Sequence, residues 1–295
     1  MSNDHLTIVT GASSNHFGCL CNLLTSLDRY EDARVLVHDL GLTEPEAQRL
    51  RDDGRNLAKF PFDRYPPHFG QSATFAIPYA WKPVIIHDAL MAAGHPVLWL
   101  DAGNLVHERL DREREQLRTV GFYSPGSPGT IADWTHPVTL QGLGARPEIL
   151  GDRNRAGGTV GFGTNDLARE IAIAWRDAAM SEAIFCPEGW SRKLHRCDQA
   201  VLSVLVAQAR RRRSFTLADG YFGISVQNDE ATPEQAARLM AMTAQEVRRE
   251  KRMAARAGQP AQPRPIQRKK KTAKKRRGLW RLWHKLKKRL QQAAA

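Results

Sequence analysis

The sequence of 295 residues contains no run of 18 or more apolar residues, so no segment predicts a helix that crosses a bilayer. Its first residues, MSNDHLTIVTGASS, lack the basic and apolar segments of a secretory signal. Cysteine is scarce, and Cys19, Cys21, Cys186 and Cys197 include no Cys-x-x-Cys spacing. This usage favours buried free thiols in a reducing compartment, and we expect a cytoplasmic protein.

Acidic residues are missing from the C-terminal part of the chain. From Arg264 onwards there are 14 Lys or Arg and no Asp or Glu, whereas residues 1–263 hold 30 basic and 31 acidic side chains. The formal net charge of +13 therefore belongs to the tail. The basic isoelectric point is thus no sign that the body of the protein binds nucleic acid.

The first hundred residues alternate short apolar runs with helical patterns. Thr43 and Glu46 have the spacing of a capping box at the start of a helix. The expected strands are 6–11, 33–41, 56–62 and 96–102, and the expected helices are 17–27, 43–53 and 78–93. This order predicts an α/β fold with a mainly parallel central sheet and helices on both faces. Ligands bind such sheets beyond the carboxyl ends of the strands.

The rest of the chain is less regular. Residues 124–157 are rich in Gly and Pro, which favours a surface loop. The segments that follow are predicted as a strand at 157–165, helices at 165–180 and 198–210, a core segment at 220–227 and a charged helix at 233–257.

Asp101 ends the last apolar run of this first part, at the edge where the crevice of an α/β sheet opens. A carboxylate there could bind Mg²⁺ or Mn²⁺ together with phosphate oxygens, or it could only cap the next turn. Gly103 offers no side chain, but Asn104 could lend its carbonyl oxygen. The residues alone leave both interpretations of Asp101 open.

Lys82, Asp198 and Asp39 also have a structural and a functional interpretation each. Lys82, near Tyr79 and Trp81, is either a surface lysine with its stem on apolar neighbours or a point charge facing a diphosphate. Asp198 either caps a helix or orients a sugar hydroxyl and serves as a general base. Asp39 ends an expected strand, where an aspartate is as often a turn residue as a binding residue.

The first expected strand ends in Thr-Gly-Ala-Ser-Ser, like the start of a dinucleotide-binding turn. Asn15 and Phe17 stand where that fingerprint needs glycines, and the chain has no Tyr-x-x-x-Lys pair, so a short-chain dehydrogenase is disfavoured. Gly11, Ala12 and Ser13 still predict a strand-to-helix turn of small residues that could accept a nucleotide.

Several segments together resemble nucleotide-sugar glycosyltransferases of the GT-A type, in which corresponding segments occur in the same order. They are TIVTGASSNHF, VLVHDLGLT, YAWKPVIIHDAL, VLWLDAGN, GGTVGFGTN and HRCDQAVL. More narrowly, they look like an uncharacterised glycosyltransferase-like domain family with a Tyr-x-Trp-Lys-Pro segment and a strand that ends in Trp-x-Asp. The likeness covers roughly residues 5–227 and implies a Rossmann-like GT-A domain.

This resemblance implies a nucleoside diphosphate-sugar donor, a glycan acceptor and a divalent cation, Mn²⁺ or Mg²⁺. The residues that would line the nucleoside by position are Thr10, Gly11, Ala12, Ser13 and Asp39. Asp101 would match the first acid of an Asp-x-Asp metal motif, with Asn104 beside it. Asp198 and Gln199 would match the Asp-Gln start of an active-site helix, and Lys82 would stabilise the leaving diphosphate. The sequence departs from the pattern at Gly103, which replaces the second acid, and it has no histidine between His195 and His284 to act as a late metal ligand.

The basic tail carries an apolar stripe. Leu279, Trp283, Leu286 and Leu290 recur at helical spacings, while Lys and Arg occupy most of the remaining surface. This pattern, with the polybasic run before it, predicts that residues 266–290 bind an anionic membrane surface. Nucleic acid is the less favoured partner, since the same charges would neutralise phosphates but have no need of the stripe. An interaction tail without a defined partner is the third interpretation.

The sequence therefore predicts a domain at 1–228, a charged helix at 229–258, a basic linker at 259–277 and an amphipathic basic helix at 278–292. The leading functional hypothesis is a cytoplasmic glycosyltransferase, peripheral on the inner face of the membrane, that acts on a cell-surface or lipid-linked glycan. A nucleotide-sugar-binding protein without turnover and a nucleic-acid binder are the alternatives.

Overall fold

The computed structural model describes residues 5–70, 78–226 and 233–257. Contacts divide the chain into two compact units, Met1–Glu250 and Lys251–Ala295. The predicted linker at 259–277 and basic helix at 278–292 lie outside the described residues, and so does the tail segment 266–290 on which the membrane prediction depends. No helix of the described residues is long and apolar enough to span a membrane.

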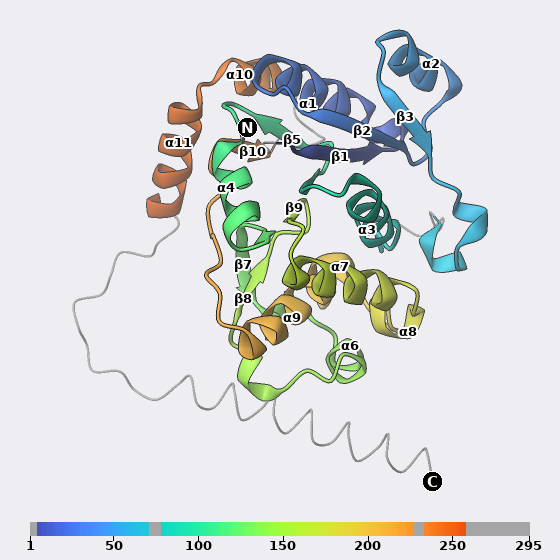
Figure 1. The fold of residues 1–295 in the computed structure, drawn as a ribbon, viewed down its shortest axis with the longest axis vertical. Coiled ribbons are helices and arrows are strands. Elements are labelled where there is room, and N and C mark those ends of the chain that lie inside the picture. Colours follow the sequence, from blue (N-terminus) through green and yellow to red (C-terminus); the bar gives the residue numbers. More distant parts are fainter. Residues whose placement is uncertain (1–4, 71–77, 227–232, 258–295) are drawn as a thin grey trace. The chain divides into compact units, whose positions relative to one another are not determined.

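A six-stranded sheet forms the centre of the first unit (Figure 1). In spatial order its strands are β3 (Asn56–Lys59), β2 (Arg34–Asp39), β1 (Thr7–Ala12), β4 (Val97–Leu100), β9 (Thr159–Phe162) and β6 (Phe122–Tyr123). β1 pairs in parallel with β2 and β4, and β2 with β3, while β9 runs antiparallel to both of its neighbours. The predicted α/β fold with a mainly parallel central sheet is confirmed.

Helices cover both faces of this sheet because side chains alternate along each buried strand. Val9 and Trp99 point to the face packed by α3 (Trp81–Ala93) and α7 (Asp166–Ala179). Ile8 and Leu98 point to the opposite face, against α1 (Phe17–Tyr30). Figure 1 shows α1 and α3 on opposite sides of β1. The apolar runs of β1 and β4 are therefore those of fully buried central strands.

Local signals fix several helix ends. α2 (Glu44–Asp52) begins at the predicted capping box, in which Thr43 and Glu46 satisfy each other's backbone groups. α3 begins at Trp81 and ends at Gly94, whose φ of 65° is the left-handed conformation that favours glycine. α7 begins after Asn165, whose side chain accepts a hydrogen bond from the Ala168 amide.

The prediction of a surface loop at 124–157 is wrong. This stretch forms β7 (Gly126–Thr130), α5 (Ile131–Trp134), α6 (Pro137–Gly142) and β8 (Arg153–Arg155). Its apolar side chains Ile131, Leu140 and Ile149 pack against α9 (Cys197–Arg212). The glycines and prolines mark the ends and irregularities of short buried elements rather than exposed chain.

The prediction of one helix at 233–257 is also wrong, because two helices form there. α10 (Pro233–Ala241) ends before Thr243, and α11 (Ala244–Ala257) begins after it. Thr243 and Glu246 form another capping box, in which the Thr243 amide and hydroxyl both donate to the Glu246 carboxylate at 2.8 Å.

The remaining elements are short. They are β5 (Asn104–Val106), α4 (Asp111–Thr119), α8 (Glu182–Phe185), β10 (Ile224–Val226) and the 3₁₀ turns Ser14–His16, Phe62–Arg64, Pro67–Phe69 and Pro147–Ile149. β10 pairs antiparallel with β5, and Asn104 at the start of β5 lines the cavity described next.

Candidate functional site

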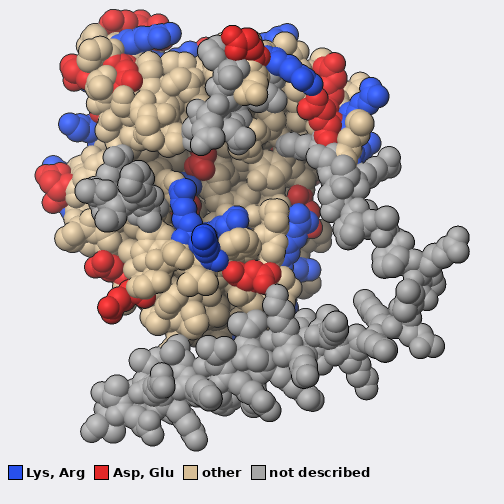
Figure 2. All heavy atoms as spheres, turned by 180° about the vertical axis from the view of Figure 1, so that it is seen from behind, with Lys and Arg blue, Asp and Glu red and all other residues tan. Residues whose placement is uncertain are grey.

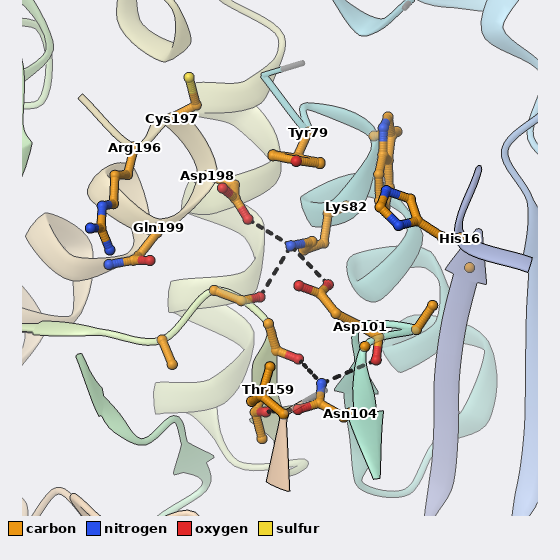
Figure 3. A pocket seen from close by; sticks show the side chains of 18 of the residues that line it. His16, Tyr79, Lys82, Asp101, Asn104, Thr159, Arg196, Cys197, Asp198 and Gln199 are labelled. Carbon is orange, nitrogen blue, oxygen red and sulfur yellow. Dashed lines mark hydrogen bonds and ion pairs between the residues drawn. The ribbon is translucent and has the colours of Figure 1, made fainter. Parts of the chain in front are cut away.

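A cavity of about 690 Å³ opens at the carboxyl edge of the sheet. It is lined by the ends of β1 and β4, the start of α3, the segment before β9 and the segment that leads into α9. Figure 3 shows Lys82 between Asp101, at the end of β4, and Asp198, in the first turn of α9. The cavity thus lies where parallel strands place ligand sites.

Lys82 is the most highly connected charged group of the cavity. Its side chain is only 3% exposed, and its ammonium lies 3.1 Å from Asp101 Oδ1 and 2.8 Å from Asp198 Oδ2. It also donates to the Gly157 carbonyl at 3.2 Å. Burial disfavours the ammonium, but the two carboxylates outweigh it and raise the pKa of Lys82 above its ordinary value. Lys82 is therefore charged, and it is not a surface lysine.

Asp101 is held by the strand that it ends. Trp99 Nε1 donates to Asp101 Oδ1 at 2.6 Å, and the Asp101 amide donates to the Gly158 carbonyl at 2.8 Å. The Asp101 carbonyl in turn accepts from the Asn104 amide at 2.8 Å. Asp101 thus initiates a turn as well as facing the cavity, where its side chain is 44% exposed.

Asp198 faces Lys82 from the first turn of α9. The indole of Trp175 donates to the Asp198 carbonyl at 3.0 Å and anchors this turn in the core. Burial raises the pKa of the Asp198 carboxyl, and the nearby Lys82 ammonium acts in the opposite direction.

Two consecutive glycines lie against the carboxylates. A Cβ atom on Gly157 would lie 2.9 Å from Asp198 Oδ2, and one on Gly158 would lie 2.6 Å from Asp101 Oδ2. A side chain at either position would require the neighbouring carboxylate to shift. The Gly-Gly pair in GGTVGFGTN is therefore a requirement of the site, which sequence reasoning interpreted only as a turn before a strand.

Backbone strain gathers around the same cavity. Among the described residues, the non-glycine residues with positive φ are Tyr79 (59°), Cys197 (31°) and Phe222 (47°). Tyr79 and Cys197 line the cavity, and Phe222 follows Tyr221, which also lines it. Conformations of this kind cost roughly 1–3 kcal/mol each and concentrate at functional sites. The backbone conformations therefore indicate a functional site at this cavity, independently of its charged residues.

The residues proposed for the nucleoside divide into two groups. Gly11, Ala12 and Ser13 line the cavity. Thr10 is completely buried within the sheet, and Asp39 is 7% exposed with its Oδ1 accepting from the amides of Gly41 and Leu42 at 2.8 and 2.7 Å. Neither Thr10 nor Asp39 belongs to the cavity lining, and Asp39 acts as a turn residue in this geometry.

The opposite wall comes from the segment before α9 and its first turn. Gln199 lines the cavity and donates to the Ser127 hydroxyl at 3.2 Å. Arg192 donates to the Tyr79 hydroxyl, and its guanidinium lies 5.7 Å from the centroid of that ring. Arg196 stacks on Trp134 with its Cζ 3.9 Å from the ring centroid. Sequence reasoning missed both arginines, because no local pattern brings residues 79 and 134 against them.

The residues of the cavity do not fit a divalent cation between the two carboxylates. Lys82 already occupies Asp101 Oδ1 and Asp198 Oδ2, and the Asn104 carbonyl oxygen accepts from the Thr159 hydroxyl at 3.2 Å. The Asn104 side chain is turned towards backbone, with its amide donating to the Gly158 carbonyl at 2.7 Å. The described residues also contain no group of three or more His, Cys, Asp or Glu placed to hold a metal.

Fold and site together define an α/β protein with a mainly parallel sheet and a charged ligand cavity at its carboxyl edge. No protein family and no curated protein matches the sequence. Solved structures that resemble it include the galactosyltransferase LgtC with donor and acceptor sugar analogues, at 15% identity and a TM-score of 0.47, over 83% of this chain and 99% of that one.

Two further solved structures give similar values. The apo bifunctional glycosyltransferase WbbM matches at 12% identity and a TM-score of 0.44, over 85% of this chain and 52% of that one. An active-site mutant of LgtC matches at 15% identity and a TM-score of 0.46, over 83% of this chain and 95% of that one. These are loose likenesses in overall architecture, and no residue role follows from them.

Proposed function

We propose that the protein is a glycosyltransferase that moves a sugar from a nucleoside diphosphate-sugar to a glycan acceptor. The observation that carries this proposal is the row of alternating charges Asp101, Lys82 and Asp198 at the base of the cavity. Carboxylates and an ammonium in alternation match the hydroxyl groups of a sugar, each of which donates one hydrogen bond and accepts others. The cavity volume also lies within the usual range for small-molecule sites.

The donor would lie along the carboxyl edge of the sheet. Its nucleoside would contact Gly11, Ala12 and Ser13, where β1 ends, and the rest of the donor would extend across the cavity, past Lys82 and Asp198, towards the opposite wall. In the reaction the acceptor oxygen bonds to the anomeric carbon, and the diphosphate leaves with the electron pair of the broken bond. The acceptor proton passes to Asp198 or to an oxygen of the leaving phosphate.

A thermal-shift screen of nucleoside diphosphates and their common sugars, with and without Mn²⁺, tests donor binding. Donor turnover is then measured for the native protein and for Asp198→Asn. Turnover that falls at least about 100-fold in Asp198→Asn, with nucleoside diphosphate affinity retained, supports the proposal. If no nucleotide or sugar nucleotide raises the melting temperature, the proposal is refuted.

A nucleotide-sugar-binding protein without turnover is the second candidate. It is favoured by the ion pairing of Lys82, which engages both carboxylates and leaves neither as a free base. Tight binding of a sugar nucleotide, together with no release of its sugar to acceptors or water, would establish this candidate in place of the first.

We also propose, from the sequence pattern alone, that residues 266–290 bind an anionic membrane surface near a cell-surface or lipid-linked acceptor. The double variant Trp283→Ser with Leu286→Ser interrupts the apolar stripe and keeps every charge. It should weaken binding to vesicles that contain anionic lipid and leave binding to DNA or RNA unchanged. Unchanged vesicle binding would contradict the membrane proposal.

A further inference from the structure

The positive charge at the base of the cavity is already matched by negative charge. Lys82 contacts one oxygen of Asp101 and one of Asp198, so the three groups together carry a net charge of −1. A diphosphate that approached these groups alone would be repelled, and it needs a further source of positive charge. A divalent cation beside Asp101 would itself be repelled by the Lys82 ammonium at short range.

The opposite wall supplies that charge. Besides Lys82, the described Lys or Arg residues that line the cavity are Arg192 and Arg196. Neither guanidinium forms an ion pair with an Asp or Glu of the described residues, in contrast to Arg155, which pairs with Asp219 at 2.7 Å. Figure 2 shows one face of the molecule, on which Lys and Arg side chains gather beside a hollow.

Both arginines are oriented before any ligand arrives. Arg192 is fixed by Tyr79, through the hydroxyl and across the ring face, and Tyr79 itself has a positive φ. Arg196 lies flat against Trp134 and is half-buried. Stacking leaves the N–H edge of a guanidinium available for two parallel hydrogen bonds, which is the geometry that phosphate oxygens accept. The half-buried Arg196 therefore has less side-chain freedom to lose on binding than the exposed Arg192.

We propose that Arg192 and Arg196 bind the diphosphate of the donor, and that this binding needs no divalent cation. The inference rests on the proposed function, since it assigns the residues that hold the leaving group. In the reaction the two guanidinium groups would face the charge that develops as the bond to the sugar breaks. Lys82 would keep the two carboxylates in place and take no proton from the acceptor.

The test is a calorimetric titration of the full-length protein with UDP, GDP, ADP and CDP, in EDTA and separately in MnCl₂. Arg192→Ala and Arg196→Ala are compared with Lys193→Ala, which removes the same charge from the same segment at an exposed residue outside the cavity lining. Arg196→Lys is added because it keeps the charge and loses the planar stacked group. Thermal melting of each variant monitors folding.

At least one nucleoside diphosphate should bind in EDTA with an affinity within about threefold of that in MnCl₂. Each arginine-to-alanine variant should weaken this binding about 10- to 100-fold, as expected for a lost charge-assisted hydrogen bond. Lys193→Ala should change it less than about threefold, because Lys193 lies outside the cavity lining and its charge is screened from the ligand. The loss of affinity in Arg196→Lys should lie between the loss in Arg196→Ala and that in Lys193→Ala.

Binding that requires MnCl₂, or equal losses in Lys193→Ala and the arginine variants, would overturn this inference and leave the proposed function standing. The absence of binding by any of the four nucleotides in either buffer would overturn both. If an arginine-to-alanine variant fails to melt cooperatively, its titration is discarded. The inference is then tested by the affinity of Arg196→Lys and by the affinities of the native protein in EDTA and in MnCl₂.

Discussion

Replacing Lys82 by methionine should strongly destabilise the protein, because it removes the one cation between two carboxylates. Methionine keeps a similar length and an apolar stem, so the main loss is the ammonium. Lys82 is 3% exposed and Asp198 8% exposed, and their atoms lie 2.8 Å apart. Removing one partner of a buried ion pair costs about 3–5 kcal/mol, since the other charge remains buried.

The second carboxylate adds little to this loss. The Asp101 side chain is 44% exposed, so water replaces much of what Lys82 provides, and the additional cost is about 0–1 kcal/mol. The total is a large part of the roughly 5–15 kcal/mol by which domains of this kind are stable.

The loss should also depend on pH. Burial raises the pKa of the Asp198 carboxyl, and the Lys82 ammonium opposes that shift, so the pKa rises further in Lys82→Met. When the pKa of a carboxyl is higher in the folded than in the unfolded state, the group stabilises the folded state at pH values below the unfolded-state pKa. This stabilisation is lost as the pH rises through the folded-state pKa. The variant should therefore be closer to the native protein at pH 5 than at pH 8.

Urea unfolding at pH 5 and pH 8 measures both effects, and Lys59→Met, at an exposed position of β3, is the matched control. The control should change the free energy of unfolding by less than about 0.5 kcal/mol. Asp198→Asn added to Lys82→Met should recover much of the loss, because it removes the unpaired charge. A deficit below about 1 kcal/mol in Lys82→Met, or one that is equal at both pH values, would refute the reasoning.

Three further predictions concern other residues. Gly158→Ala should cost about 1–3 kcal/mol, because its Cβ would meet Asp101, whereas Gly18→Ala, in open space within α1, should be neutral or stabilising in the same unfolding assay. Burial lowers the pKa of His195 to about 4, so its contribution to stability should be complete above about pH 6.5 and be lost as pH falls through 4, by about 3 kcal/mol in all. His195→Gln should flatten this part of the pH profile of urea unfolding, and an unchanged slope would contradict the assignment. Thr243→Ala should weaken α11 by about 1 kcal/mol, seen as faster amide exchange at the start of that helix and not in α7.

The sequence predicted the centre of the sheet well, because strands that are buried on both faces read as continuous apolar runs. β1 and β4 are examples, and the capping box at Thr43 placed the start of α2 as predicted. Asp101 was placed at the carboxyl edge for the same reason. These features depend on neighbouring residues in the chain, which sequence patterns record.

Features that depend on distant partners escaped prediction. In the stretch 124–157, Arg155 is buried because Asp219 pairs with it and the carbonyls of Ser124 and Ala218 accept its hydrogen bonds. The loop prediction followed from the glycines and prolines of this stretch, and nothing local in the sequence indicates the distant partners of Arg155. The two ion pairs of Lys82 were missed in the same way. A lysine beside aromatic residues gives no sign that carboxylates from two other elements will pair with it.

The break between α10 and α11 is a different case, because its signal was present. Thr243 and Glu246 have the capping-box spacing in TAQE, within a run of good helix formers. Helix propensity over the whole run favoured one helix, and the cap was strong enough to divide it.

The two carboxylates that share Lys82 enter the structure at different stages of synthesis and folding. Asp101 lies close to Lys82 in the chain, whereas Asp198 is 116 residues away and arrives with α9. A nascent chain that has released β4 but not α9 holds this lysine with a single carboxylate. Because closing a long loop costs entropy before its contacts form, we expect the contact with Asp198 to be absent from the folding transition state. Lys82→Met should then mainly speed unfolding and leave the folding rate nearly unchanged, so the charged row at the base of the cavity would govern how long a finished molecule stays folded rather than how fast it folds.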